Sequence, residues 1–184
     1  LALAACPNPI DCADFFVRQH YLDFLDRVPE PSGLAAWLGV LNNCAVGDLT
    51  CQHEQRLTTS AAFFGSAEFQ LKGYFAFRFY RTAFARLPEY SEIAADMTSV
   101  SGQTPDDVYA RKATFTNGFV QRPEFVTLFN GLPSADYVGA LMSRYNLNSI
   151  ITPDPSQPDG TTKVTLTESQ LVSHLNAGTL TRAQ

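Results

Sequence analysis

A helical motif that occurs twice in the chain limits its fold more than any other feature of the sequence. The second copy lies 59 positions after the first and repeats four residue types at identical spacing, so that Tyr21, Arg27, Pro29 and Glu30 become Tyr80, Arg86, Pro88 and Glu89. Self-similarity at a fixed period of this size is the signature of a repeated supersecondary unit. The motif therefore predicts repeated helical units, and its recurrence weakens any interpretation as an active-site signature.

The composition fits a folded, acidic chain of 184 residues. Hydrophobic residues make up 45% and aromatic residues 12%, enough for a packed interior, and the charged fraction of 17% is too low for a largely disordered chain. The net charge of −5 argues against nucleic acid as a partner, because phosphate binding needs a basic surface. We interpret the one basic cluster, Lys72, Arg78, Arg81 and Arg86, as a solvated helix face. No apolar run approaches the roughly 18 residues of a membrane-spanning helix.

Four cysteines lie in the first third of the chain, at positions 6, 12, 44 and 51. Their spacing lacks the tight two-residue knuckle of common structural zinc sites, so we expect two disulfides and an oxidising compartment. Four cysteines allow three connectivities. We favour Cys44–Cys51, because the residues between them can form a compact loop between two helices, and Cys6–Cys12 then follows by elimination.

The residues before Cys6 allow a second interpretation of that cysteine. Leu3-Ala4-Ala5-Cys6 resembles the end of a bacterial lipoprotein signal, in which the cysteine carries lipid. The even number of cysteines favours a disulfide over lipid at Cys6.

Hydrophobic periodicity predicts helices in the first unit, over about 13–25, from Ser32 to about residue 41, from about Thr50 to Phe64, and in a short turn after Ser66. The second unit repeats this order. It contains a deeply buried aromatic helix over 74–85, a helix capped by Ser91 and a helix that begins after Thr104 and reaches Phe119.

A third unit is expected to begin with a helix at Ser134. An enlarged Pro/Asp/Gly loop follows at 152–160, and another helix covers about 167–178. The last six residues should open one more helix, so we expect the third unit to be incomplete. No strand pattern with clean alternation of useful length is present.

We therefore expect one all-α domain over 1–184, made of repeated helical units packed around a shared aromatic-rich core, with disulfides near the N-terminus. The units cover about 13–70, 74–130 and, incompletely, 134–184. The apolar stripes of the predicted helices supply the core anchors, which are Tyr21, Trp37, Phe64, Phe69, Tyr80 and Phe125.

The run from Arg18 to Arg27, followed by Pro31-Ser32-Gly33-Leu34 and Trp37, resembles the bacterial domain-of-unknown-function 4214 family. The resemblance continues over 60–69 and 175–184. It implies a helical extracellular module of large secreted or surface bacterial proteins, with no established reaction or ligand. A more distant similarity to the helical linker domains of phycobilisomes rests on the same signatures. The second unit has Glu92 and Asp96 in place of the Gly and Trp, so its turn and second helix are expected to be distorted.

Each of the first two units carries an Arg at the end of its first helix and a Glu in its last helix. We expect Arg27 to pair with Glu68 and Arg86 with Glu124, each pair tying the first turn of its unit to the last helix. A catalytic carboxylate activated by an Arg would need a second acid or a nucleophile that repeats with it, and none does.

Other candidate chemistry is sparse. His20, His53 and His174 lie in separate segments without metal-ligand spacing, and we interpret them as helix-surface residues. No nucleophile elbow occurs. Asp154, Asp159 and Gly160 hint at calcium, but positions 155 and 157 of an EF-hand-like loop are Pro and Gln, so an exposed turn is favoured and no cofactor is expected.

These observations predict a non-catalytic extracellular structural or interaction module, secreted or at a bacterial cell surface. Its partner would be a protein or the extracellular matrix. The alternatives are a secreted hydrolase and a carbohydrate-binding module acting on cell-wall or matrix material. Trp37 is expected in the core rather than on a sugar-stacking surface, and the enlarged loop is the better ligand candidate by its location.

Overall fold

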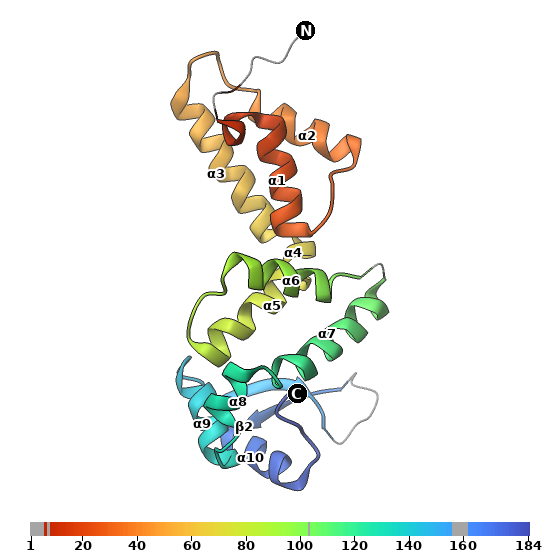
Figure 1. The fold of residues 1–184 in the computed structure, drawn as a ribbon, viewed down its shortest axis with the longest axis vertical. Helices are drawn as coiled ribbons and strands as arrows, with labels where there is room; N and C mark the ends of the chain where they lie inside the picture. The colour runs from red at the N-terminus through yellow and green to blue at the C-terminus, as the bar shows by residue number, and fades with distance from the viewer. Residues whose placement is uncertain (1–5, 7, 103, 156–161) are drawn as a thin grey trace. The chain divides into compact units, whose positions relative to one another are not determined.

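A computed structural model describes residues 6, 8–102, 104–155 and 162–184 (Figure 1). Helices dominate these residues, and two short strands lie near the C-terminal end. In chain order the elements are η1 (Pro9–Asp11), α1 (Ala13–Leu25), α2 (Pro31–Leu41), α3 (Leu49–Gly65), α4 (Ala67–Leu71), α5 (Gly73–Phe79), the π-helix η2 (Tyr80–Phe84), α6 (Tyr90–Val100), α7 (Pro105–Phe119), α8 (Pro123–Phe129), α9 (Ser134–Ser143), β1 (Ser149–Pro153), β2 (Lys163–Thr167) and α10 (Glu168–Ala177).

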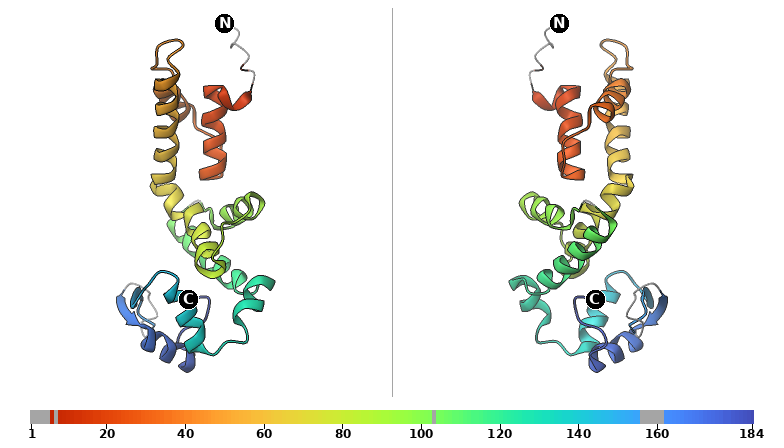
Figure 2. Two further views of the ribbon diagram at one scale, coloured as in Figure 1. Left: turned by 90° about the vertical axis from the view of Figure 1, so that its left-hand side faces the viewer. Right: turned by 90° about the vertical axis from the view of Figure 1, so that its right-hand side faces the viewer.

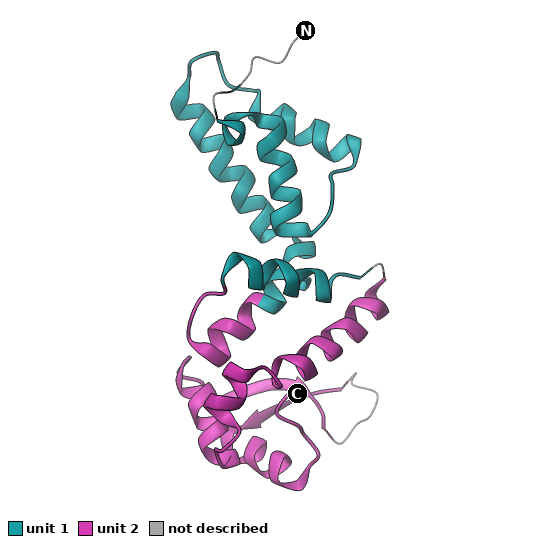
Figure 3. Ribbon diagram, in the orientation of Figure 1, with its two compact units in different colours: residues 1–76, 89–103 teal, residues 77–88, 104–184 magenta. Residues whose placement is uncertain are grey.

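The chain folds into two compact units (Figure 3). Unit 1 consists of residues 1–76 and 89–103, and unit 2 of residues 77–88 and 104–184. These boundaries differ from those of the sequence repeats, because the segment 89–103, which belongs to the second repeat, packs with the first. Helix α6 is therefore part of unit 1.

The helix boundaries repeat along the chain. Helices α2 and α6 are each 11 residues long and begin 59 positions apart, at Pro31 and Tyr90. Helices α3 and α7 begin 56 positions apart, at Leu49 and Pro105. The difference arises in one connection, since seven residues (42–48) join α2 to α3 whereas four (101–104) join α6 to α7.

The longer connection contains a disulfide. Cys44 and Cys51 are bonded across it, and Cys6 is bonded to Cys12 directly before α1. The predicted pairing is confirmed. The sulfur of Cys6 is thus in the disulfide that the even number of cysteines favours.

The core of unit 1 forms where α1, α2 and α3 pack together (Figure 2). Phe63 of α3 lies at its centre, with ring centroids 5.1 Å from Tyr21, 5.2 Å from Trp37 and 5.4 Å from His20. The buried members are Phe16, Val17, Tyr21, Leu25, Leu41, Phe63 and Phe69. Burial of these large side chains supplies the main stabilisation of the unit.

Unit 2 has a matching aromatic cluster. Its central ring is Phe119, the repeat equivalent of Phe63, which is 1% exposed. The Phe119 ring centroid lies 5.2 Å from Phe79, 5.0 Å from Phe84 and 5.6 Å from Phe115. The expectation of an aromatic-rich interior therefore holds, with one such cluster in each unit.

The aromatic helix predicted over 74–85 is less regular and less buried than expected. It is an α-helix up to Phe79 and a π-helix from Tyr80 to Phe84, and it ends at Ala85 in the left-handed conformation. Tyr80 is buried, but Tyr74 and Phe84 are only half-buried. Aromatic residues on every side of one helix cannot all face a single core, so part of this surface stays accessible.

The predicted distortion of the second repeat's turn and helix is wrong. Helix α6 is regular, because Glu92 closes a capping box with Glu89: its side chain accepts a hydrogen bond from the Glu89 backbone N–H at 2.7 Å. In the first repeat the equivalent position is Gly33. A Cβ there would overlap Glu30 Oε1 and the Tyr21 hydroxyl. At this position of the repeat, Glu92 caps its helix, whereas Gly33 leaves room for Glu30 and Tyr21.

The main departure from the predicted all-helical chain lies in the third sequence repeat, 134–184, which is part of unit 2. Helix α9 is followed by an antiparallel hairpin in which Ile151 pairs with Thr165 and Ile150 with Leu166. The strands are five residues each and rich in β-branched side chains, which favour a pleated surface. The last residue of β2, Thr167, is also the N-cap of α10.

The final residues do not form the predicted helix. They pack instead against α8, α9 and the connection between them. The Arg182 guanidinium donates to the carbonyl oxygens of Phe129 and Leu132 and lies 4.8 Å from the Tyr137 ring centroid. The Tyr137 hydroxyl donates to the Arg182 carbonyl at 2.9 Å. Among the described residues, no helix combines the length and apolar character needed to cross a bilayer.

Candidate functional site

The charged residues repeated in the sequence tie each repeat together. In the first repeat, Arg27 follows the left-handed residue that ends α1, and its Nε and Nη2 donate to the two oxygens of Glu68 at 3.1 Å each. Its Nη1 donates to Glu30 Oε2 at 2.6 Å. The guanidinium also lies 4.9 Å from the Tyr21 ring centroid. One arginine thus joins the end of α1, the start of α2 and helix α4.

The electrostatics of this contact follow from its geometry. Burial alone would raise the pKa of Glu68, but hydrogen bonds and charge from Arg27, with a smaller contribution from Lys72, hold it below its usual 4.5. The hydrogen bond from Arg27 to Glu68 in turn raises the pKa of Arg27. Both side chains are about a third exposed, at 39% and 30%, so solvent weakens the pair relative to a fully buried one.

The second repeat carries the same contact. Arg86 donates from Nε to Glu124 Oε1 at 3.0 Å and from Nη2 to Glu124 Oε2 at 2.7 Å, and its guanidinium lies 5.1 Å from the Tyr80 ring centroid. Arg122 donates to the Tyr80 hydroxyl at 2.6 Å. The structure therefore brings together both predicted ion pairs. Of the basic cluster interpreted as a solvated face, Arg78 and Arg81 are exposed as expected, whereas Lys72 and Arg86 are half-buried and lie in ion pairs.

All six predicted core anchors contact other aromatic rings, but they are not equally buried. Four of them, Tyr21, Phe69, Tyr80 and Phe125, are buried. Trp37 is half-buried against Phe63. Phe64, in contrast, is 48% exposed, and the core position belongs to its neighbour Phe63. One residue along a helix turns the side chain by roughly 100°, so only one of two adjacent Phe residues can face the core.

The interpretation of all three histidines as surface residues is wrong for His20. Its ring is buried between aromatic side chains, Nδ1 lies 2.9 Å from the Phe16 carbonyl, and Nε2 lies 2.8 Å from Ser60 Oγ. Burial lowers the pKa of His20 below its ordinary 6.5. His53 is exposed, and His174 is half-buried at the end of α10.

In the part of the chain that the structure describes, no three His, Cys, Asp or Glu side chains gather into a set that could hold a metal ion. Of the residues considered for calcium, Asp154 extends the hairpin through a backbone hydrogen bond from its N–H to the Thr162 carbonyl at 2.8 Å. Asp159 and Gly160 lie outside the described residues.

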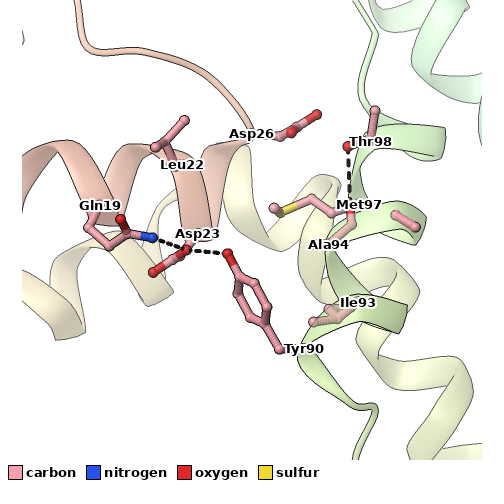
Figure 4. A pocket seen from close by; sticks show the side chains of 10 residues that line it. Gln19, Leu22, Asp23, Asp26, Tyr90, Ile93, Ala94, Met97 and Thr98 are labelled. Carbon is pink, nitrogen blue, oxygen red and sulfur yellow. Dashed lines mark hydrogen bonds between the residues drawn. The ribbon is translucent and has the colours of Figure 1, made fainter.

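A pocket between α1 and α6 is the candidate functional site, and its residues were not singled out from the sequence (Figure 4). Both helices belong to unit 1, and the pocket has a volume of about 430 Å³. Helix α1 and the residue after it contribute Gln19, Leu22, Asp23 and Asp26, and α6 contributes Tyr90, Ile93, Ala94, Ala95, Met97 and Thr98.

The polar side of the pocket carries two carboxylates. Asp23 Oδ1 accepts hydrogen bonds from Gln19 Nε2 at 2.7 Å and from the Tyr90 hydroxyl at 2.9 Å, which fixes its orientation. The hydrogen bond to Asp23 raises the pKa of Tyr90. No hydrogen bond or ion pair to the Asp26 side chain occurs among the described residues. The site therefore combines one positioned and one unpaired negative charge.

The repeat shows that the turn after the first helix does not require an acid. The equivalents of Asp23 and Asp26, 59 positions later, are Thr82 and Ala85. Ala85 adopts the same left-handed conformation as Asp26, each with a φ of 54°. The turn thus forms with or without the Asp26 carboxylate, so that acid needs another explanation, whereas Asp23 also has a structural role because it accepts the hydroxyl bond that joins α6 to α1.

No family model, curated protein or solved structure matches the chain. The resemblance to the domain-of-unknown-function family therefore depends on the quoted residues alone.

Proposed function

We propose that the chain is a non-catalytic extracellular module of a secreted or surface bacterial protein, and that it binds a protein or matrix partner. The observation that carries the binding role is the pocket between α1 and α6, which lies on the helix face where the two repeats differ. Repeats keep in common what the fold needs, so a site specific to one of them is a candidate for function. The resemblance to the bacterial family supports the same role.

The extracellular location is supported by the disulfides. Both Cys6–Cys12 and Cys44–Cys51 are formed, and disulfides persist in oxidising compartments. The Cys44–Cys51 bond closes a loop with two exposed apolar side chains, Val46 and Leu49.

A carbohydrate ligand is the second candidate. The Tyr90 side chain is 66% exposed beside the Asp23 carboxylate. Amphipathic aromatic rings next to hydrogen-bonding groups are suited to mixed apolar and polar ligands such as sugars. A hydrolase would also use carboxylates in a pocket, and the same experiment tests it.

The test uses the oxidised full chain against bacterial cell surfaces, purified cell-wall material and matrix proteins, with binding followed by flow cytometry and biolayer interferometry. Saturable binding without release of soluble fragments by mass spectrometry would support the proposed module. Time-dependent release of fragments would identify a hydrolase instead. Binding confined to purified glycans on an array would favour the carbohydrate-binding alternative, and no saturable binding to any of these surfaces would contradict the proposal.

A further inference from the structure

We propose that the pocket between α1 and α6 binds a lysine or arginine side chain from an exposed basic segment of a partner protein. This inference depends on the proposed interaction role and adds the chemistry of the partner. It is argued from the charge of the pocket, its apolar wall and the comparison with the second repeat.

The charge in the pocket favours a cation. Asp23 and Asp26 are its charged side chains, and no lysine or arginine lines it. Asp23 uses Oδ1 to bind Gln19 and Tyr90, and no hydrogen bond to its Oδ2 occurs in the described part of the chain. The free oxygens of these two carboxylates could accept N–H groups of an ammonium or guanidinium group through charge-assisted hydrogen bonds.

The apolar lining of the pocket suits the rest of a basic side chain. Leu22, Ile93 and Met97 provide an apolar surface, and Leu22 stays 47% exposed. Lysine and arginine bury their methylene stems on such surfaces while the charged end stays polar. The ring of Tyr90 adds an aromatic face near the position of the cation. A small inorganic cation would use none of this wall.

A calcium ion also fits the carboxylates less well. Calcium takes about six to eight oxygen ligands, and the described acids of the pocket are only Asp23 and Asp26. An organic cation needs fewer oxygens, because each N–H group donates a single hydrogen bond.

The second repeat reverses the charge of the same helix face. The equivalents of Gln19 and Leu22 are Arg78 and Arg81, and those of Asp23 and Asp26 are Thr82 and Ala85. The repeat therefore folds with either basic or acidic residues on this helix face. The fold does not dictate the acidic character of this face in the first repeat, so a ligand can account for it.

The probe is a short peptide with three lysines separated by serines. Its controls are the same peptide with norleucine, which keeps the stem and removes the charge, and with glutamate. Each is titrated into the full chain, and binding is followed by calorimetry and by NMR shifts of the Met97 methyl group and the Tyr90 ring. We expect saturable binding of the lysine peptide, at least about tenfold tighter than of either control, which corresponds to about 1.4 kcal/mol.

The decisive variant is Asp23→Thr with Asp26→Ala, which places the residues of the second repeat in the first. Thr82 and Ala85 occupy these positions in a folded repeat, so the variant should fold although it loses the hydrogen bond from Tyr90, and its thermal melt and disulfides are checked first. Affinity for the lysine peptide should fall at least about tenfold. The matched control is Asp11→Asn with Glu54→Gln, two exposed acids of unit 1 outside the pocket, and it should bind like the wild type.

Three results would overturn the proposal: no binding of the lysine peptide up to about 5 mM, equal binding of the norleucine peptide, or unchanged affinity in the Asp23→Thr, Asp26→Ala variant. Calcium that displaces the lysine peptide stoichiometrically would also overturn it in favour of a metal site. If the folded variant keeps its saturable binding to cell surfaces, the pocket inference fails while the module role stands. If the wild type binds no surface at all, the proposed function itself fails.

Discussion

Arg27 holds Glu68 through two parallel N–H to oxygen bonds of 3.1 Å across 41 residues of sequence. Arg86 and Glu124 repeat this contact in unit 2. The recurrence of a two-bond geometry at equivalent positions indicates that the contact is part of the repeat itself, since bidentate pairing restricts both distance and orientation.

Removing the acid of this pair should destabilise the chain moderately. We expect Glu68→Gln to lower the free energy of unfolding by about 1–2 kcal/mol, because the pair is charge-assisted but partly solvated. Chemical denaturation measures this, with Glu54→Gln as control, since Glu54 is exposed on α3 and should cost nothing measurable. A loss as small as that of the control would mean that the contact is not structural.

Two glycines of α2 should respond in opposite directions to alanine. Gly39→Ala meets no atom within 4 Å and should stabilise the helix by about 0.5–1 kcal/mol. Gly33→Ala would place a Cβ against Glu30 and Tyr21, so it should destabilise despite the same gain in helix propensity. Thermal melts of the two variants test this, and equal melting temperatures would show that the space beside Gly33 is not restricted.

The Cys44–Cys51 bond should contribute about 2–3 kcal/mol, as the chain-entropy model gives for so short a loop. Replacing both cysteines with serine should then lower the melting temperature by roughly 5–10 °C for a chain of this size. Differential scanning calorimetry under non-reducing conditions measures the change. In reductant, where neither protein has a disulfide, the variant should melt at the same temperature as the wild type. A difference between these two melting temperatures would mean that the serines themselves disturb the fold.

Stability should fall in mild acid. The folded-state pKa of His20 is lower than its ordinary 6.5, so the unfolded chain takes up the proton first. The contribution of His20 to the free energy of unfolding is complete above about pH 6.5. It is lost as the pH falls from there toward the lower pKa of the folded state, with a slope of at most about 1.4 kcal/mol per pH unit. The lowered pKa of Glu68 adds a second loss below its usual 4.5.

Denaturation curves between pH 5 and pH 8 test the histidine part of this prediction. His20→Gln should remove the slope below pH 6.5, whereas His53→Gln should keep it, because His53 is exposed. A slope that survives in the His20 variant would assign the acid sensitivity to other groups.

The sequence predicts most of the helices because their signals are local. Helix α1 has the predicted bounds of 13–25, and α7 begins after the Thr104 cap and ends at Phe119 as expected. Caps, prolines and apolar periodicity are all contained within one segment, so they can be read without knowledge of the packing.

The missed features depend on contacts between distant segments. The burial of His20 requires Ser60, which lies 40 residues away. The pocket forms only when α6 packs against α1, and its acids look like ordinary surface residues in the sequence. The hairpin was missed because each strand is only five residues long, too short for alternation to stand out from neighbouring loops.

The disulfide between α2 and α3 also determines what happens when this exposed connection is cut. Val46 and Gly47 lie between Cys44 and Cys51 in an exposed loop of unit 1, a kind of segment that proteases cleave readily. A cut there leaves both ends of the chain covalently attached through the sulfur bridge. In an oxidising compartment, a nick at the connection that distinguishes the first repeat from the second would therefore not release a fragment.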